Sequence, residues 1–242
     1  MTTQPATRQA GTLYGVGVGP GDPELITLKA QRVLRLVPVL CVPKGKEDAA
    51  SYVRGFISEM LDPGRQEVIE LVFPMTKDRT VLERYWDSAV ERVVAVLREG
   101  RDVAFVTEGD PSIYSTFMHL HALVRERYPD IAVMVIPGVS SINASAALAG
   151  LPLVDGSERL AVVPATYEGE QLEQVLASFD TVVLLKVNRV FDRVLGLLEQ
   201  LGLADRATYV KRCGAPDQEI VRDVRSLRGQ ELDYLSLLIV KK

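Results

Sequence analysis

The sequence predicts two α/β domains, an N-terminal domain with a mostly parallel sheet and a C-terminal domain with a mixed sheet. Up to residue 137, short apolar runs that suit buried strands alternate with longer segments of helical periodicity. This alternation is typical of parallel strands that are covered by helices. Beyond that point the strands follow one another with fewer helices between them, which favours a mixed sheet. We place the two domains at 11–137 and 138–242.

The first strand is the apolar run at 12–18, and the Gly-Pro-Gly-Asp-Pro turn at 19–23 ends it. Pro23 suits the first turn of a helix and Asp22 suits its N-cap, so we predict a helix over 24–36.

The rest of the first domain follows from the spacing of apolar residues. A strand at 37–42 is weakened by Pro38. The further predicted elements are a helix at 49–60, a strand at 67–72, a helix at 78–99, a strand at 102–107, a helix at 112–127 and a strand at 131–136.

The second domain opens with a helix of small residues at 142–149. Apolar runs predict its strands, and segments of helical spacing lie between them. The predicted strands are 160–164, 181–187, 208–213, 219–223 and 235–240, and the predicted helices are 170–178 and 190–201.

Composition excludes several classes of function. The chain has 242 residues and a net charge of −4, which argues against general nucleic-acid binding. Cys41 and Cys213 form no C-x-x-C motif, and His119 and His121 point to different faces of one helix, so we expect no metal site. Residues 1–11 are polar and no apolar run approaches the ~20 residues of a membrane span, so we expect no signal peptide, no membrane segment and a cytoplasmic protein.

Two glycine-containing turns follow predicted strands. The turn at 15–23 does not match the G-x-G-x-x-G spacing, and no acidic residue ends the second strand, so a dinucleotide site is not indicated. The second turn, Gly109-Asp110-Pro111, lies at the carboxyl end of a strand, where open α/β sheets bind ligands. Gly109 allows a ligand to approach the backbone closely.

Three ordered motifs resemble the signatures of the tetrapyrrole (corrin/porphyrin) methylases, which use S-adenosylmethionine (SAM). They are the segment 17–30, the Gly109-Asp110-Pro111 turn followed by Tyr114, and the segment 135–147. The resemblance extends over nearly the whole chain from residue 12. It implies the tetrapyrrole methylase fold and a homodimer of two-domain subunits with SAM in a cleft between the domains.

Within this family, the segments 105–117, 209–214 and 234–237 resemble the enzymes that methylate C-20 in cobalamin synthesis. Their substrate is precorrin-2 or its cobalt-containing counterpart, cobalt-factor II, and their product is precorrin-3A or cobalt-factor III. Methylation of another ring position, or SAM binding without catalysis, remains an alternative. Methyl transfer requires mainly alignment of donor and acceptor and exclusion of water, and the sequence does not identify a catalytic residue.

The resemblance also implies site residues. Pro20 and Gly109 suit turns as well as ligand contact, and Ser140 and Ser141 also suit helix capping. The residues expected to contact SAM are Pro20, Gly109, Asp110, Tyr114, Ser140, Ser141, Lys186, Val187, Cys213, Gly214 and Leu235. Arginine and lysine match the many carboxylates of the acceptor, and the basic candidates for substrate binding are Lys44, Arg54, Lys77 and Arg79.

Overall fold

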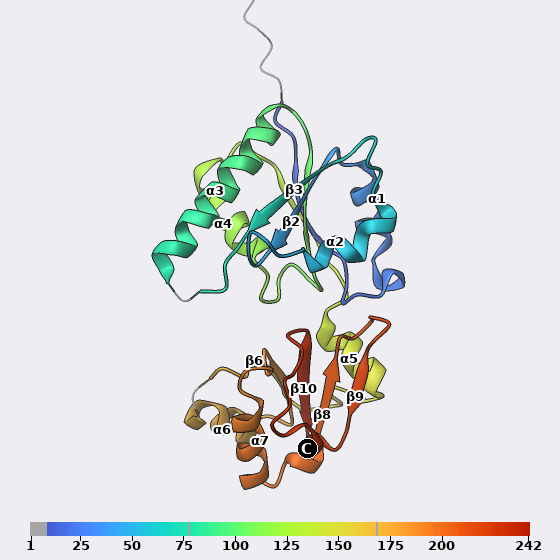
Figure 1. Cartoon of the computed structure of the whole chain (residues 1–242), viewed down its shortest axis with the longest axis vertical. Coiled ribbons are helices and arrows are strands. Elements are labelled where there is room, and N and C mark those ends of the chain that lie inside the picture. Colours follow the sequence, from blue (N-terminus) through green and yellow to red (C-terminus); the bar gives the residue numbers. More distant parts are fainter. Residues whose placement is uncertain (1–8, 77, 168) are drawn as a thin grey trace, which may run out of the picture. The chain divides into compact units, whose positions relative to one another are not determined.

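The computed structural model of the chain describes residues 9–76, 78–167 and 169–242. The chain divides into two compact units, one ending at Ser140 and one spanning Ser141–Lys242. Each unit contains one five-stranded sheet with helices (Figure 1), so the predicted α/β class is confirmed. The sequence placed the junction between residues 137 and 138, close to this division.

The sheet of the N-terminal unit has the strand order β3-β2-β4-β1-β5. All of its pairings are parallel, and the register sets Gly17 of β1 opposite Thr107 of β4. The ends of these two central strands are therefore level with each other. The strands are β1 (Leu13–Gly17), β2 (Val39–Lys44), β3 (Glu67–Val72), β4 (Val103–Thr107) and β5 (Val133–Ile136).

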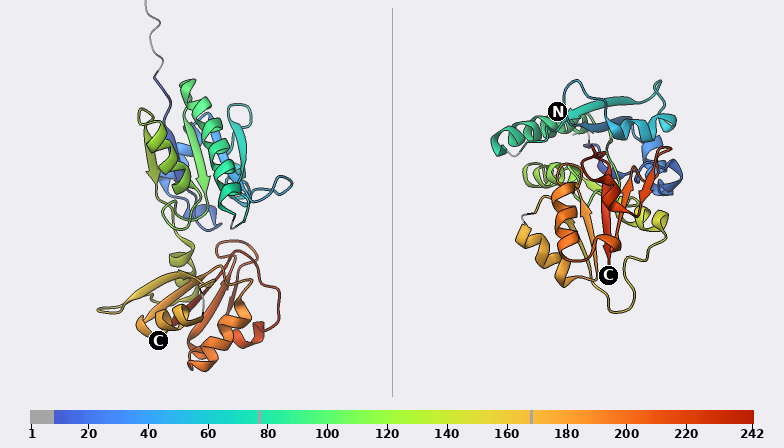
Figure 2. Two further views of the ribbon diagram at one scale, coloured as in Figure 1. Left: turned by 90° about the vertical axis from the view of Figure 1, so that its left-hand side faces the viewer. Right: turned by 60° about the horizontal axis from the view of Figure 1, so that its bottom comes forward.

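Helices cover both faces of this sheet. The helices α1 (Leu28–Leu36) and α2 (Tyr52–Ile57) lie on one face, and α3 (Arg79–Arg98) and α4 (Phe117–Arg127) lie together on the other (Figures 1 and 2). Central strands that are buried on both faces need apolar side chains at successive positions. In β4 the residues from Val103 to Val106 are all fully buried, which explains the continuous apolar run in the sequence.

Two helices of this unit begin later than the sequence predicted. The segment Pro23–Leu25 is a 3-10 turn capped by Asp22, whose carboxylate accepts from the Glu24 N–H. The helix α1 starts only after Thr27, because Thr27 Oγ1 accepts from the Ala30 N–H at 3.2 Å and forms the N-cap. The expected single helix over 24–36 is therefore wrong in its first turn.

The expected start of α4 at residue 112 is also wrong, since the helix begins at Phe117. Tyr114 has a left-handed backbone with φ of 50°, which interrupts any right-handed helix. Three further differences are smaller, and one of them is that β5 begins at Val133 rather than at residue 131. The strand β2 begins after Pro38 and continues to Lys44, and α2 spans only Tyr52–Ile57 before a 3-10 turn at Ser58–Met60.

The C-terminal unit has a mixed sheet, as predicted, and its strand order is β6-β7-β10-β8-β9. Only the β6–β7 pairing is parallel among the described pairings. The strands are β6 (Leu160–Pro164), β7 (Thr181–Leu185), β8 (Ala207–Lys211), β9 (Glu219–Val221) and β10 (Ser236–Lys241). The unit also contains 3-10 turns at Ala204–Arg206 and Val224–Leu227.

Three helices pack on this second sheet. The helices α6 (Gly169–Ser178) and α7 (Phe191–Gln200) bury one face, where Leu172, Leu195 and Tyr209 belong to a single apolar cluster. The helix α5 (Ser141–Ala149) lies on the other side (Figure 1).

Three strands of this unit end earlier than predicted, and one of them, β9, ends at Val221 rather than at residue 223. The strand β7 ends at Leu185 and β8 ends at Lys211. The residues that follow, Lys186 and Arg212, have φ of 59° and 46°, and a left-handed residue cannot continue a strand. In the described part of the chain, no helix is long and apolar enough to cross a membrane.

Candidate functional site

The central strands β1 and β4 lie side by side, and their connections leave on opposite faces of the sheet. The chain after β1 leads to α1 on one face, and the chain after β4 leads to α4 on the other. In open α/β sheets this divergence opens a crevice at the carboxyl ends of the strands, and ligands bind there. The topology therefore indicates a binding site at the loops that follow Gly17 and Thr107.

Backbone hydrogen bonds join these two loops. The Val18 N–H donates to the Thr107 carbonyl at 3.0 Å. Beyond it, Gly19 and Gly109 exchange bonds in both directions, at 2.8 and 3.3 Å. Both glycines have left-handed backbones, with φ of 78° and 60°. Glycine is the residue that adopts this conformation without a steric cost, so it suits both positions.

The third loop, which follows β5, is held by Asp110. Its Oδ2 accepts from the Gly138 N–H at 3.0 Å, and its Oδ1 accepts from the Ser112 N–H at 2.8 Å and from the Ser112 hydroxyl. Burial opposes the charge of Asp110, but these hydrogen bonds outweigh it and hold the pKa of the carboxyl below its ordinary value. The carboxylate thus fastens the β4 and β5 loops together.

Gly17 and Gly138 are required by the closeness of these loops. A Cβ on Gly138 would lie 2.2 Å from the Gly109 carbonyl oxygen, and a Cβ on Gly17 would lie 2.5 Å from the same atom. Neither distance is compatible with a real side chain. The three loops therefore meet through backbone.

Tyr114 is the exposed aromatic side chain of the β4 loop, with 54% of its surface accessible. Its left-handed φ costs about 1–2 kcal/mol for a residue with a Cβ. Next to it, the Ser115 hydroxyl lies 3.0 Å from Thr107 Oγ1 and accepts from the Phe117 N–H. In the described chain the non-glycine residues with positive φ are Tyr114, Lys186 and Arg212. Such strain clusters at functional sites, and the sequence had selected the first two as site residues.

Glu108 is the residue between Thr107 and Gly109, and sequence reasoning did not select it. Its side chain is partly buried, and within the described residues its carboxylate has no hydrogen-bond or ion-pair partner. Burial raises the pKa of Glu108 to about 7. No motif identifies such a residue, because its character comes from burial and from the absence of a partner.

The expected site residues of the C-terminal unit also gather at one edge of their own sheet. Lys186 and Val187 follow β7, and Cys213 and Gly214 follow β8. Leu235 precedes β10, which runs antiparallel to both strands, and its carbonyl accepts from the Arg212 N–H at 2.7 Å. The sheet therefore brings all five residues together within this unit.

The remaining expected contacts lie around the β1 loop and the end of the N-terminal unit. Pro20 is partly buried beside Gly19, and Ser140 is buried. Ser141 is the first residue of α5. Contact between these residues and a cofactor stays a prediction from the motifs.

The basic residues expected to bind substrate have different surroundings. Lys44 and Arg54 both pair with Glu70, each with an N···O distance of 3.1 Å, and the pKa of Glu70 lies below its ordinary value chiefly because of the hydrogen bond from Lys44. Arg79 is highly exposed and pairs with Glu83 on its own helix. Lys77 lies outside the described residues.

The part of the chain that the structure describes offers no arrangement for a metal centre. In residues 9–76, 78–167 and 169–242, no group of three or more histidine, cysteine, aspartate or glutamate side chains is placed to hold a metal ion. His119 and His121 lie on α4, and His119 stacks on Trp86 with a centroid distance of 4.5 Å. Burial raises the pKa of the Cys41 thiol to about 12, so it is inert at neutral pH.

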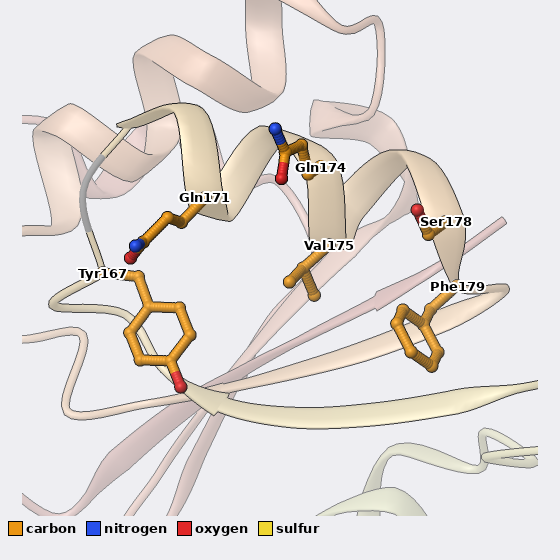
Figure 3. Close-up of a pocket in the computed structure, with 6 residues that line it drawn as sticks. All are labelled: Tyr167, Gln171, Gln174, Val175, Ser178 and Phe179. Atoms are coloured by element: carbon orange, nitrogen blue, oxygen red, sulfur yellow. The ribbon is translucent and has the colours of Figure 1, made fainter.

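A surface pocket of about 360 Å³ lies along α6 in the C-terminal unit. Figure 3 shows the rings of Tyr167 and Phe179 at its two ends with Val175 between them. The pocket is lined by Tyr167, Gln171, Gln174, Val175, Ser178 and Phe179. None of these side chains is charged and none was selected from the sequence, so this pocket is distinct from the loops described above.

Comparisons with known proteins agree with this architecture. The family described as Tetrapyrrole (Corrin/Porphyrin) Methylases matches residues 12–227. A precorrin-2 C(20)-methyltransferase from a Sinorhizobium species is 35% identical over 95% of both chains. A probable cobalt-precorrin-2 C(20)-methyltransferase from Methanocaldococcus jannaschii is 43% identical over 141 residues, and this match spans 58% of the length of each protein.

Solved structures show the same fold. A uroporphyrin-III C-methyltransferase from Thermus thermophilus, in complex with S-adenosylhomocysteine, has a TM-score of 0.68 to this chain and 24% sequence identity. The similarity covers 96% of this chain and 98% of the Thermus chain.

Proposed function

Because the chain belongs to the tetrapyrrole (corrin/porphyrin) methylase family, we propose that it transfers a methyl group from SAM to C-20 of precorrin-2. The cobalt-containing counterpart, cobalt-factor II, is an equivalent acceptor in this proposal. The product is the trimethylated precorrin-3A or cobalt-factor III of cobalamin synthesis. The observation that carries the proposal is the meeting of three family motifs at the carboxyl ends of β1, β4 and β5, supported by two relatives named for C-20 methylation.

The residues at this edge fit a SAM molecule. The β1, β4 and β5 loops meet through Gly17, Gly19, Gly109 and Gly138, so backbone groups rather than side chains lie where they join. Backbone N–H and C=O groups suit a ligand that carries both hydrogen-bond acceptors and hydrogen-bond donors. When bound, SAM supplies a methyl group that its sulfonium charge already activates.

The protein's contribution in this proposal is alignment and exclusion of water. The hydrogen bonds between Gly19 and Gly109, and the bond from Gly138 to Asp110, fix the loop backbones before any ligand arrives. A site that is already ordered loses less conformational entropy on binding. Pro20, Tyr114, Ser140 and Ser141 extend from this frame and remain our proposed contacts.

The C-terminal residues Lys186, Val187, Cys213, Gly214 and Leu235 are proposed contacts on the strength of family resemblance. Titration of Lys186→Gly and Gly214→Val variants with S-adenosylhomocysteine tests this part separately. We expect weaker binding for Gly214→Val and a folded protein in both cases. If both variants bound S-adenosylhomocysteine with wild-type affinity, neither Lys186 nor Gly214 would contact the cofactor.

The experiment for the proposed reaction is incubation with SAM and precorrin-2, with and without cobalt. We expect one equivalent of S-adenosylhomocysteine per methylated tetrapyrrole. Binding of S-adenosylhomocysteine without turnover of either acceptor would favour a homologue that binds the cofactor without catalysis. Methylation at another carbon would favour a different member of the family.

We further propose that the protein is a homodimer, because the resemblance to the family implies one. Sedimentation at micromolar concentration is expected to give twice the mass of the chain. A monomer under these conditions would refute this point without affecting the proposed reaction.

A further inference from the structure

One carboxylate of the N-terminal sheet holds two cationic side chains. Glu70 Oε2 lies 3.1 Å from Lys44 Nζ, and Glu70 Oε1 accepts from Arg54 Nη1 at the same distance. Among the described residues, neither cation pairs with another carboxylate. Each oxygen of Glu70 therefore binds one cation, and the three side chains form a row in the order Lys44, Glu70, Arg54.

This row lies on one face of the sheet, near the carboxyl end of β2. Val42 and Val68 pack in one apolar cluster with α2, and residues two apart in a strand point to the same face. Lys44 and Glu70 therefore face α2, which supplies Arg54. The strand β2 pairs with β4, whose loop carries the second family motif. Neighbouring strands are about 4.8 Å apart, so a large acceptor held at the β4 loop can reach the row.

The two cations differ in what they can offer a ligand. The side chain of Lys44 is only 12% accessible, and its ammonium group also donates to the Glu47 carbonyl at 2.5 Å. The side chain of Arg54 is 54% accessible, and in the described chain a single one of its five N–H groups donates. Its Nε–Nη2 edge remains for a fork of two hydrogen bonds to a carboxylate. Arg54 is therefore the member that can bind a ligand, while Lys44 holds Glu70.

Glu70 is also held through its backbone. Arg92 of α3 donates from Nη1 to the Glu70 carbonyl at 3.1 Å. The pKa of the Glu70 carboxyl lies below its ordinary value, chiefly because of the hydrogen bond from Lys44, so this group is charged at neutral pH. Three cationic side chains then surround one carboxylate, which leaves an excess of positive charge here in a chain whose net charge is −4. This excess complements a ligand with many carboxylates.

We propose that Glu70 is a positioning residue that orients the Arg54 guanidinium to bind a carboxylate of the tetrapyrrole acceptor. This inference rests on the acceptor of the proposed function. An exposed arginine samples many rotamers, and ordering it on binding costs free energy. The ion pair with Glu70 fixes one end of the guanidinium in advance and leaves the Nε–Nη2 edge for the acceptor. An arginine ordered in this way binds a carboxylate more tightly than a mobile one.

Glu70 has a second, opposing effect, because its negative charge repels an anionic ligand. Charge interactions at this exposure are weak and are screened by salt. Lys44 and Arg92 also outweigh the single charge of Glu70. We therefore expect the orientation of Arg54 to dominate. The direction in which Glu70→Gln changes affinity separates the two effects, since loss of orientation weakens binding and loss of repulsion strengthens it.

The test is an equilibrium titration with precorrin-2, followed by the absorbance of the tetrapyrrole. We expect Glu70→Gln to raise the Kd about 3- to 10-fold and Glu70→Asp, which keeps the charge, to raise it less. The Kd for S-adenosylhomocysteine should be unchanged. Glu199→Gln is the matched control, because Glu199 of α7 also pairs with two arginines, Arg225 and Arg228, and its side chain is 35% accessible against 30% for Glu70. It should bind precorrin-2 as wild type does.

A double-mutant cycle determines whether Glu70 acts through Arg54. Arg54→Ala should itself weaken precorrin-2 binding, and adding Glu70→Gln to this variant should change the Kd by at most about 2-fold. A merely structural role of Glu70 would weaken binding equally in both backgrounds. Such an equal effect, or a Kd of Glu70→Gln that is the same as or lower than that of wild type, would overturn the proposal.

Binding is measured without turnover, which separates this inference from the proposed reaction. If the Glu70 variants behave as expected but wild type transfers no methyl group, the reaction fails and the role of Glu70 in binding stands. If wild type methylates C-20 and Glu70→Gln binds precorrin-2 normally, only the role of Glu70 fails. A wild-type protein that binds neither precorrin-2 nor its cobalt form would overturn both.

Discussion

The carboxylate of Asp110 and the backbone N–H of Gly138 form a 3.0 Å hydrogen bond that joins the loops after β4 and β5. The other oxygen of the same carboxylate binds Ser112 within its own loop. Asp110 therefore organises two of the three motifs, which gives it a structural role beside the cofactor contact expected from the sequence.

Replacing Asp110 with asparagine should weaken this junction. One carboxylate oxygen would be replaced by an NH2 group, which cannot accept from the N–H of Ser112 or Gly138. We expect a loss of about 1–3 kcal/mol in the free energy of unfolding. Asp62→Asn is the matched control, because a single oxygen of Asp62 accepts from Gly64 at an exposed turn. Urea unfolding measures both. Equal stability losses would mean that the Gly138 contact contributes nothing.

Gly138→Ala should separate the loops without changing any polar group. The added Cβ would lie 2.2 Å from the Gly109 carbonyl oxygen and 2.8 Å from the Gly17 carbonyl carbon, so backbone must move. We expect a loss of about 1–3 kcal/mol of stability and about 10-fold weaker S-adenosylhomocysteine binding. Gly196→Ala in α7 meets no atom within 4 Å and should instead stabilise the protein by up to about 1 kcal/mol. Calorimetry measures both the stability and the binding of S-adenosylhomocysteine. If Gly138→Ala bound S-adenosylhomocysteine with wild-type affinity, the loops would tolerate separation.

Glu108 also predicts how stability depends on pH. Its pKa is about 7 when folded and lies at the ordinary value of 4.5 when unfolded, so the folded state holds the proton more tightly between these values. Its contribution therefore makes the folded state less stable as pH rises from 4.5 to 7. The difference in unfolding free energy between Glu108→Gln and wild type should grow in favour of the variant over this range. A difference that is constant with pH would contradict the burial of the charged group.

The substrate candidates Lys44 and Arg54 make a separate prediction. Both form ion pairs with Glu70 near the end of β2. A polycarboxylate acceptor would bind more tightly to such a pair of cationic side chains. Lys44→Ala and Arg54→Ala should raise KM for the tetrapyrrole several-fold, less at high salt, and leave KM for SAM unchanged. Arg65→Ala is the control, as Arg65 is exposed and has no ion pair among the described residues. If KM for the tetrapyrrole is the same in all variants and at all salt concentrations, other groups hold the carboxylates.

Much of the fold could be predicted from apolar patterns, because these depend on neighbours in the sequence. The apolar run at 160–164 gives β6 with the same limits, and the strand predicted at 67–72 gives β3 with the same limits. The starts of α1 and α4 could not be predicted in this way. They depend on Thr27 acting as a cap and on the left-handed backbone of Tyr114.

In the candidate site, too, some features could be predicted from the sequence and others could not. Motif spacing identified Gly109, Asp110 and Tyr114, whose residue types carry the information. It did not reveal the contact of Asp110 with Gly138, which joins distant parts of the chain, or the isolation of Glu108. The pairing of Lys44 and Arg54 with Glu70 likewise depends on how β2, α2 and β3 pack.

The most direct measurement of the central claim is the position of the transferred methyl group. The wild-type protein would be incubated with SAM labelled with ¹³C in its methyl group and with precorrin-2 or its cobalt form, and the product analysed by NMR and mass spectrometry. We predict a single labelled methyl group on C-20, with S-adenosylhomocysteine formed in equal amount. A labelled methyl group on any other carbon, or no labelled product with either acceptor, would contradict the proposed function.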